Sequence, residues 1–154
     1  MTKVLAGVRC GLAGLNEVGA YLGPLALRLL LAYEFWEAGV EKFNGTNYFG
    51  EFVDKFPFPF NVIPVETSWF LATWTELLGP IALVLGLATR FFTASLMILT
   101  VVAIVSVHAG NGYTISEGGW KLPLMYLVMF LPLLLSGPGK LSLDYWIAKK
   151  TFKE

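Results

Sequence analysis

Long apolar stretches separated by short polar connections dominate the pattern of this chain. A helix that crosses a bilayer needs roughly 20 predominantly apolar residues, and four stretches come close to that length. Pro24 stands where the first is expected to begin, because proline is favoured at the first helical position. The stretches cover about residues 24–43, 68–87, 91–109 and 120–136. The sequence therefore predicts an all-α protein, an integral membrane four-helix bundle that forms a single domain over residues 1–154.

The segment before the first stretch, residues 1–23, has a different pattern. Its apolar residues recur every three or four positions, at Val4, Leu5, Val8, Leu12, Leu15 and Val18. That spacing is typical of an amphipathic helix lying at a membrane surface. Glu17 interrupts any continuous apolar core, so the segment is a poor candidate for a secretory signal peptide.

Lysine and arginine residues are distributed unevenly between the two sides of the predicted bundle. Seven lie on the side of the termini: Lys3, Arg9, Arg90, Lys140, Lys149, Lys150 and Lys153. Three lie on the other side: Lys42, Lys55 and Lys121. Because an excess of basic residues marks the cytoplasmic side, both termini are predicted to be cytoplasmic. In a bacterium, the connections at 44–67 and 110–119 would then face the periplasm.

Composition supports a membrane protein rather than a soluble one. Apolar residues make up 56% of the chain and charged residues 14%, whereas a soluble domain carries about 25% charged residues. The formal net charge is zero, so nothing in the charge balance would attract nucleic acid. Cys10 is the only cysteine, which excludes an intrachain disulfide or thiol pair.

The connection at 44–67 is unusually aromatic for a segment exposed to water. Its aromatic residues are Tyr48, Phe49, Phe52, Phe56, Phe58 and Phe60. We expect it to fold back onto the bundle or to enter the headgroup layer, where Trp69, Trp74 and Trp120 would form an interfacial belt. Two interpretations stay open, namely simple membrane anchoring and a lid or entry gate for a lipid-soluble ligand.

Ionisable side chains inside the predicted spans carry the functional signal, because each costs roughly 2.5–3.5 kcal/mol at the bilayer centre. These residues are Arg28, Glu34, Glu37, Glu41, Glu76 and His108. At about 100° per residue, Glu37 lies about 60° from Glu34 and about 40° from Glu41, so all three share one helix face. Three helices can therefore bring carboxylates and one imidazole to a common depth. Arg28 lies on the opposite face, where we expect it to contact an anionic lipid headgroup or a carbonyl of another helix.

The predicted cluster suggests proton handling beside a bound ligand, because buried carboxyl groups in membranes relay protons. The catalytic candidates are Glu37, Glu76 and His108. The ligand-binding candidates are Glu34, Trp69, Thr73 and Trp74. Two alternatives stay open: the acids and the imidazole hydrogen-bond to one another and only hold the bundle together, or they bind a metal. The metal set would be Glu34, Glu37, Glu76 and His108, a partial match to the carboxylate and histidine ligands of di-iron bundles.

The order and spacing of several motifs resemble the DoxX family over roughly residues 24–146. The matching features are Arg28, Gly39 and Lys42-Phe43 in the first helix, the segment from Glu76 to Arg90 with Gly79-Pro80 and Gly86, His108 followed by Asn111-Gly112, and the tail from Gly137 to Asp144. Many members of that family have a histidine where this chain has Ala38. Here Glu34 and Glu37 stand nearby instead, which puts any function that needs that imidazole in question.

The resemblance implies a small four-helix protein of the bacterial inner membrane. Some relatives are linked to thiosulfate:quinone oxidoreductase, and others to membrane redox or oxidative-stress complexes. We therefore expect a redox-associated subunit that binds a quinone or a similar apolar ligand, with electrons passing through that ligand, a metal or a redox partner protein. The alternatives are metal or proton-coupled transport, and a non-catalytic scaffold that recruits a partner through residues 143–154. Assembly into a homo-oligomer also stays open.

Overall fold

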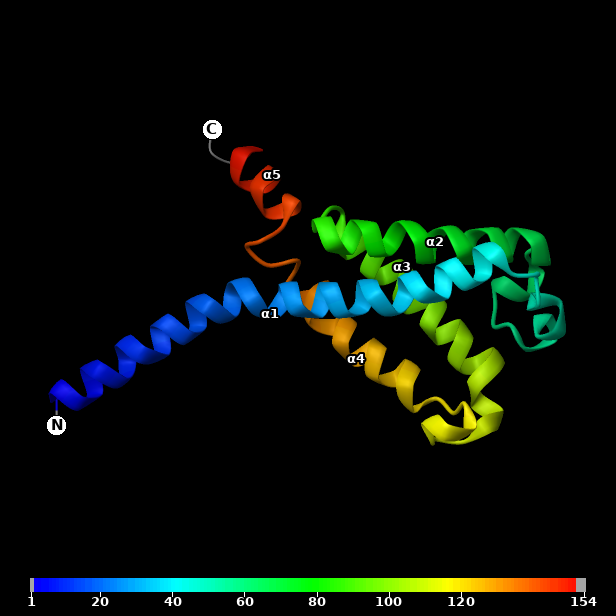
Figure 1. The fold of residues 1–154 in the computed structure, drawn as a ribbon, viewed down its shortest axis with the longest axis horizontal. Helices are drawn as coiled ribbons and strands as arrows, with labels where there is room; N and C mark the ends of the chain where they lie inside the picture. Colours follow the sequence, from blue (N-terminus) through cyan, green and yellow to red (C-terminus); the bar gives the residue numbers. More distant parts are fainter. Residues whose placement is uncertain (1, 152–154) are drawn as a thin grey trace.

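The computed structural model describes residues 2–151, and these form helices and turns without a β-strand. Lys153 and the end of the predicted partner-binding segment lie outside the described residues, as do the side chains of residues 2–8 and of Cys10. The main elements are α1 (Thr2–Asn44), α2 (Val65–Leu85), α3 (Thr89–Ala103), α4 (Lys121–Leu135) and α5 (Leu143–Thr151). The first four make up the bundle, and α5 lies at one end of it beside the end of α2 (Figure 1).

Three helical segments are long and apolar enough to cross a membrane: Gly11–Asn44, Val65–Leu85 and Thr89–Asn111. They overlap three of the predicted spans and confirm that these stretches are long apolar helices. The fourth segment, α4, is apolar but has only 15 residues. At about 1.5 Å per residue it is about 22 Å long, shorter than a hydrocarbon core of about 30 Å. A crossing by α4 therefore stays a prediction.

The first helix begins far earlier than predicted. α1 runs without interruption from Thr2, and Pro24 lies inside it, so the expectation that Pro24 starts the helix is wrong. A proline inside a helix lacks an N–H and leaves the carbonyl four residues earlier without its helical partner. That carbonyl belongs to Ala20, and the N–H of Lys140 donates to it over 3.4 Å. The C-terminal segment thus supplies the partner that lets the helix continue.

A small apolar core joins all four long helices. It consists of Leu31, Ala32, Phe35, Leu83, Leu96, Phe130 and Leu133. The ring of Phe35 packs against Phe130 and Tyr126, with ring centroids 5.3 and 5.7 Å away. Because lipid is as apolar as these side chains, their close packing rather than their removal from water holds the helices together.

The end of the third span departs from a regular α-helix. After Ala103 the chain forms a π-helical turn, η4 (Ile104–His108), and then the 3₁₀ turn η5 (Ala109–Asn111). A further 3₁₀ turn, η6 (Ile115–Glu117), precedes α4. π-helical turns are rare and occur frequently at functional sites. His108 therefore leaves the regular helical register that the sequence pattern assumed.

The aromatic connection between α1 and α2 folds back onto the bundle, which confirms the prediction. It forms three 3₁₀ turns, η1 (Phe49–Glu51), η2 (Val53–Lys55) and η3 (Phe60–Val62), drawn in teal at the far end of α2 (Figure 1). Phe56 is only 7% exposed. The Ser106 hydroxyl of η4 donates to the carbonyl of Lys55 over 3.3 Å, which attaches the loop to the third span.

Arg28 joins the end of α2 to the segment that follows α4. Its side chain is only 1% exposed. Nε donates to the carbonyl of Leu83 over 2.6 Å, and Nη2 donates to that of Val84 over 2.7 Å. Nη1 donates to the carbonyls of Pro138 and Leu141, over 3.0 and 2.7 Å. The expectation of a carbonyl partner is confirmed, and a lipid headgroup is excluded because the guanidinium is buried.

Candidate functional site

An ion pair inside the bundle joins α1 to α2. Glu76 belongs to the central part of α2 and is 7% exposed. Lys42 lies in the last turn of α1, and its Nζ is 2.7 Å from Oε2 of Glu76. A charge held away from water needs a partner of opposite sign, because an isolated one is costly. Lys42 and Glu76 therefore stabilise each other as a unit.

A largely apolar cavity of about 390 Å³, here called the loop-side cavity, lies beside this ion pair. Lys42, Glu76 and His108 all line it. Most of the remaining wall is apolar and comes from the folded-back loop, α2 and the third span: Tyr48, Phe49, Phe52, Phe56, Phe60, Leu71, Ile98, Leu99 and Val102. An apolar cavity of this size with a few polar groups in its wall is typical of a binding site for a small organic ligand.

A smaller cavity of about 180 Å³, here called the inner cavity, extends towards α4. Its polar lining comes mainly from Glu34, Glu76, His108 and Tyr126. Glu76 and His108 line both cavities, so these two side chains stand between them. The structure thus brings together three of the predicted site residues, from α1, α2 and the third span.

Hydrogen bonds fix two polar groups of the inner cavity. The hydroxyl of Tyr126 donates to Oε2 of Glu34, which connects α4 to α1. Nδ1 of His108 lies 2.6 Å from the carbonyl oxygen of Gly118. Because a carbonyl oxygen can only accept, Nδ1 carries the proton, and Nε2 of the neutral ring is the nitrogen that can accept one. The imidazole is thereby held in one tautomer.

Glu37 is not part of this arrangement. It lies on the exposed side of α1, as Glu41 does, and it lines neither cavity. Of the three acids predicted to share one helix face, only Glu34 is turned inward. The reason is the rotation of α1 about its own axis, which places Phe35 and Leu31 in the core and leaves Glu37 exposed.

The predicted ligand-binding residues of α2 line neither cavity either. The Thr73 hydroxyl donates to the carbonyl of Trp69 within the same helix, over 2.8 Å. The ring of Trp69 packs edge-on against Tyr48 and Phe49, each with a centroid distance of 5.0 Å. Trp69 therefore supports the loop that covers the loop-side cavity, while the exposed Trp74 packs against neighbouring aromatic rings.

The predicted metal set is not assembled as a metal centre. Among the side chains that the structure describes, no group of three or more histidine, cysteine, aspartate or glutamate residues is placed to hold a metal ion. Glu34, Glu76 and His108 are instead directed to a tyrosine hydroxyl, a lysine ammonium and a backbone carbonyl.

Comparison with known proteins identifies the family. The DoxX family pattern matches residues 23–109, more than half of the chain. The chain belongs to the DoxX family. The match includes Lys42, Glu76 and His108, whereas Tyr126 lies beyond it. With three helices long and apolar enough to span a bilayer, this DoxX protein is a membrane protein.

Two relatives of this DoxX protein come from Haemophilus influenzae, and both are described as uncharacterized proteins. One is 49% identical over 135 residues, which cover 88% of this chain and 89% of the relative. The other is 32% identical over 131 residues, which cover 80% of this chain and 90% of the relative. No solved structure matches the chain significantly. These similarities extend over most of the length of each protein, but they indicate no activity because neither relative has one assigned to it.

The sequence pattern did not predict two residues of the site in this DoxX protein, Lys42 and Tyr126. Lys42 stands at the expected end of the first span, where a lysine ordinarily reaches water, so the pattern predicts that it belongs to the flank of the span. Tyr126 could have been recognised from the sequence, because its hydroxyl is a polar group in the middle of an apolar helix and needs a hydrogen-bond partner there. Its pairing with Glu34 depends on how α4 packs against α1, which the pattern of either helix alone does not specify.

Proposed function

We propose that this protein is a redox-associated subunit of the bacterial inner membrane that binds a quinone or a similar apolar carbonyl compound. One observation carries the proposal: the apolar loop-side cavity has an ion pair and an imidazole in its wall. A quinone combines a flat apolar ring with two carbonyl oxygens. The apolar wall would accommodate the ring, and the ammonium of Lys42 would donate a hydrogen bond to one carbonyl oxygen.

Glu76 and His108 would exchange the protons with the ligand. Reduction of a quinone to a quinol adds two electrons and two protons, and oxidation releases both. In this proposal a redox partner protein exchanges the electrons. With a carboxylate at Glu76 and an unprotonated Nε2 at His108, the two groups would accept the two protons that a quinol releases on oxidation. Reduction of a quinone would use the same two groups after each has taken up a proton. Glu34 and Tyr126, in the inner cavity, would then restore the protonation of these two groups, because Glu76 and His108 line both cavities.

A lipid-soluble ligand has a direct route to this site. Leu71 on α2 and Ile98 on α3 both line the loop-side cavity, yet they are 50% and 52% exposed. The cavity wall therefore includes side chains on the outer face of the bundle, which would border the acyl chains of the bilayer. Entry between α2 and α3, under the folded-back loop, would spare an apolar ligand any passage through water.

The proposed setting is a multi-pass protein with both termini in the cytoplasm. Four helices would cross the inner membrane, with α4 as a short crossing. The aromatic loop and the loop-side cavity would then lie on the periplasmic side. This arrangement follows from the excess of lysine and arginine at the termini and in the turn between α2 and α3.

The test is native mass spectrometry of the protein, purified gently from native membranes into lipid nanodiscs. Wild type is compared with the double variant Lys42→Gln/Glu76→Gln, which removes both charges together and so leaves no buried charge unpaired. Glu37→Gln is the control, because it makes the same chemical change as Glu76→Gln at an exposed position of α1 outside both cavities. We expect a quinone mass on wild type and on Glu37→Gln, and at least a tenfold loss in the double variant.

Other outcomes point elsewhere. A quinone retained equally by the double variant would show that the loop-side cavity is not the site. A metal mass on wild type that disappears in the double variant would favour metal handling. Protein that carries neither, but copurifies with a stable partner, would favour the scaffold function.

A further inference from the structure

A second cavity, at the opposite end of the bundle from the aromatic loop, is independent of the proposed quinone site. It has a volume of about 640 Å³ and is here called the tail cleft. It lies where α2 gives way to α3, and its walls come from α1, the start of α3, the segment 136–140 and α5. If α2 and α3 span the bilayer, the turn between them marks one membrane surface, so the tail cleft lies at headgroup depth.

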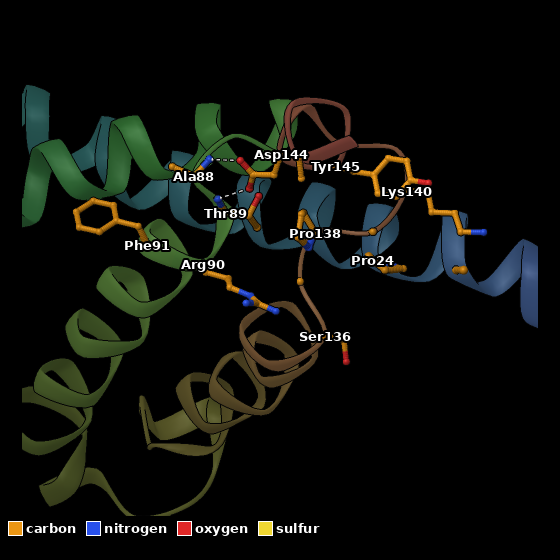
Figure 2. A pocket seen from close by; sticks show the side chains of 14 residues that line it. Pro24, Ala88, Thr89, Arg90, Phe91, Ser136, Pro138, Lys140, Asp144 and Tyr145 are labelled. Carbon is orange, nitrogen blue, oxygen red and sulfur yellow. Dashed lines mark hydrogen bonds between the residues drawn. The ribbon is translucent and has the colours of Figure 1, made fainter. Parts of the chain in front are cut away.

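The side chains that line the tail cleft carry more positive than negative charge. Arg90, Lys140 and Asp144 line it. The two carboxylate oxygens of Asp144 accept the N–H groups of Ala88 and Thr89 over 2.7 and 2.8 Å, and Figure 2 shows these two bonds. Asp144 is thus committed to the N-terminus of α3. Among the described side chains, no carboxylate forms an ion pair with Arg90 or Lys140.

The two cations stand on different sides of the cleft. The Arg90 side chain extends from α3 towards the segment at Pro138, and the Lys140 side chain extends beyond that segment, alongside α1 (Figure 2). One guanidinium nitrogen of Arg90 donates to the carbonyl of Leu135 over 3.2 Å. The ammonium of Lys140 lies 4.9 Å from the ring centroid of Tyr21. Positive charge is therefore spread along the cleft and held by neutral partners.

A buried hydroxyl in the same wall lacks a partner. Thr89 lines the tail cleft and is fully buried, and its Oγ1 has no hydrogen bond within the described structure. Buried polar atoms are almost always hydrogen-bonded, and an exception calls for an unseen partner. Because Thr89 has no exposed surface, this hydroxyl lies behind the wall of the cleft, and the cations Arg90 and Lys140 are the groups that a ligand would meet.

The surroundings of the cleft are apolar. Phe91, which lines it, is 68% exposed, and Leu135, beside it at the end of α4, is 71% exposed. A soluble anion would gain nothing from these side chains, whereas the acyl chains of a lipid would pack against them. Basic pockets between membrane helices are suited to acidic lipid headgroups.

We propose that the tail cleft binds the phosphate-bearing headgroup of an anionic phospholipid. Arg90 and Lys140 would attract the headgroup, and the acyl chains would follow the exposed apolar surface of α3 and α4. The bound lipid would brace α5 and the segment 136–140 against the rest of the bundle.

The test measures lipid binding by native mass spectrometry on the full chain in detergent, titrated with phosphatidylglycerol or with phosphatidylcholine of the same acyl chains. The variant is Arg90→Gln/Lys140→Gln. Its control is Lys149→Gln/Lys150→Gln, which removes the same formal charge from exposed positions of α5 outside the cleft. Lys140→Gln alone is included as a milder change, and inorganic phosphate is titrated in a separate arm.

We expect one tightly bound phosphatidylglycerol and no comparable phosphatidylcholine. Each cation near an anionic surface contributes about a factor of five to the affinity. The affinity for phosphatidylglycerol should therefore fall about fivefold in Lys140→Gln and about 25-fold in the cleft double variant. The α5 control should bind as wild type does. Equal losses in both double variants, equal binding of the two lipids, or tighter binding of free phosphate than of lipid would each overturn the proposal.

Discussion

The backbones of Gly39 and Glu76 are in direct contact: a Cβ atom added at Gly39 would lie 2.8 Å from the carbonyl carbon and oxygen of Glu76. Only a glycine permits this approach of α1 to α2. Pro80, four residues after Glu76, has no N–H for that carbonyl, so the carbonyl is not needed by its own helix. Lys42 lies one turn beyond Gly39, and the close approach brings its ammonium within reach of the Glu76 carboxylate.

Gly39→Ala should therefore separate α1 from α2. We expect a loss of about 1–3 kcal/mol in the free energy of unfolding, as for other overpacked contacts, measured by denaturant titration in mixed micelles. Gly23→Ala is the matched control, because nothing lies within 4 Å of a Cβ there, and alanine favours a helix by up to about 1 kcal/mol over glycine. Equal stability of the two variants would contradict the close contact.

Arg28→Lys should destabilise the protein although it keeps the charge. An ammonium cannot reproduce the four bonds that the guanidinium donates to carbonyls of α2 and the tail. Each buried carbonyl left without a donor costs about 1–3 kcal/mol, and unfolding in mixed micelles would measure the sum. Arg90→Lys, at an exposed arginine with one such bond, should stay within about 0.5 kcal/mol of wild type.

The Lys42–Glu76 ion pair should show strong coupling in a double-mutant cycle. Lys42→Gln and Glu76→Gln alone should each cost about 3–5 kcal/mol, because each leaves one charge unpaired in the bundle. The double variant should cost clearly less than the sum of the two. Thermal and denaturant unfolding of the four proteins would measure this, and additive losses would show that the two side chains act separately.

Both termini should be inaccessible from outside the cell. Cys10 is the only cysteine, so a Cys10→Ser background allows single cysteines at exposed positions: Thr46→Cys and Ser116→Cys in the two loops, and Lys150→Cys in α5. A membrane-impermeant maleimide added to spheroplasts should label the loop positions at once and the α5 position only after lysis. Labelling of Ser116→Cys and Lys150→Cys from the same side would show that α4 does not cross.

Regular periodicity located the helices well where it applied. The predicted stretch 68–87 corresponds to Val65–Leu85, and 120–136 corresponds to Lys121–Leu135, because apolar length and glycine or proline boundaries are local properties. The pattern also predicts a helix within residues 1–23, and α1 covers this segment from Thr2. The continuity of this helix with the first span could not be predicted in the same way. At Pro24, the carbonyl of Ala20 that loses its helical partner receives the N–H of Lys140 instead, which is far away in the sequence.

In the candidate site, too, some features could be predicted from local sequence and others could not. Counting residues along straight spans predicts that Glu76 and His108 lie near each other, and both line the same two cavities although His108 lies in the π-helical turn. The outward position of Glu37 and the inward reach of Lys42 depend on the rotation of α1 about its axis. That rotation is set by contacts such as that of Gly39 with Glu76. Such contacts involve two helices, so the apolar periodicity of one helix alone does not predict them.

The unbroken course of α1 also determines how far the start of this helix lies from the aromatic loop. Its 43 residues make a rod of about 65 Å, more than twice the thickness of a hydrocarbon core of about 30 Å. The N-terminal part must therefore leave the bilayer, on the side away from the aromatic loop (Figure 1). A fluorescent protein or an affinity tag fused to the N-terminus would stand clear of the loop-side cavity, which makes this end the better attachment point for ligand-binding assays.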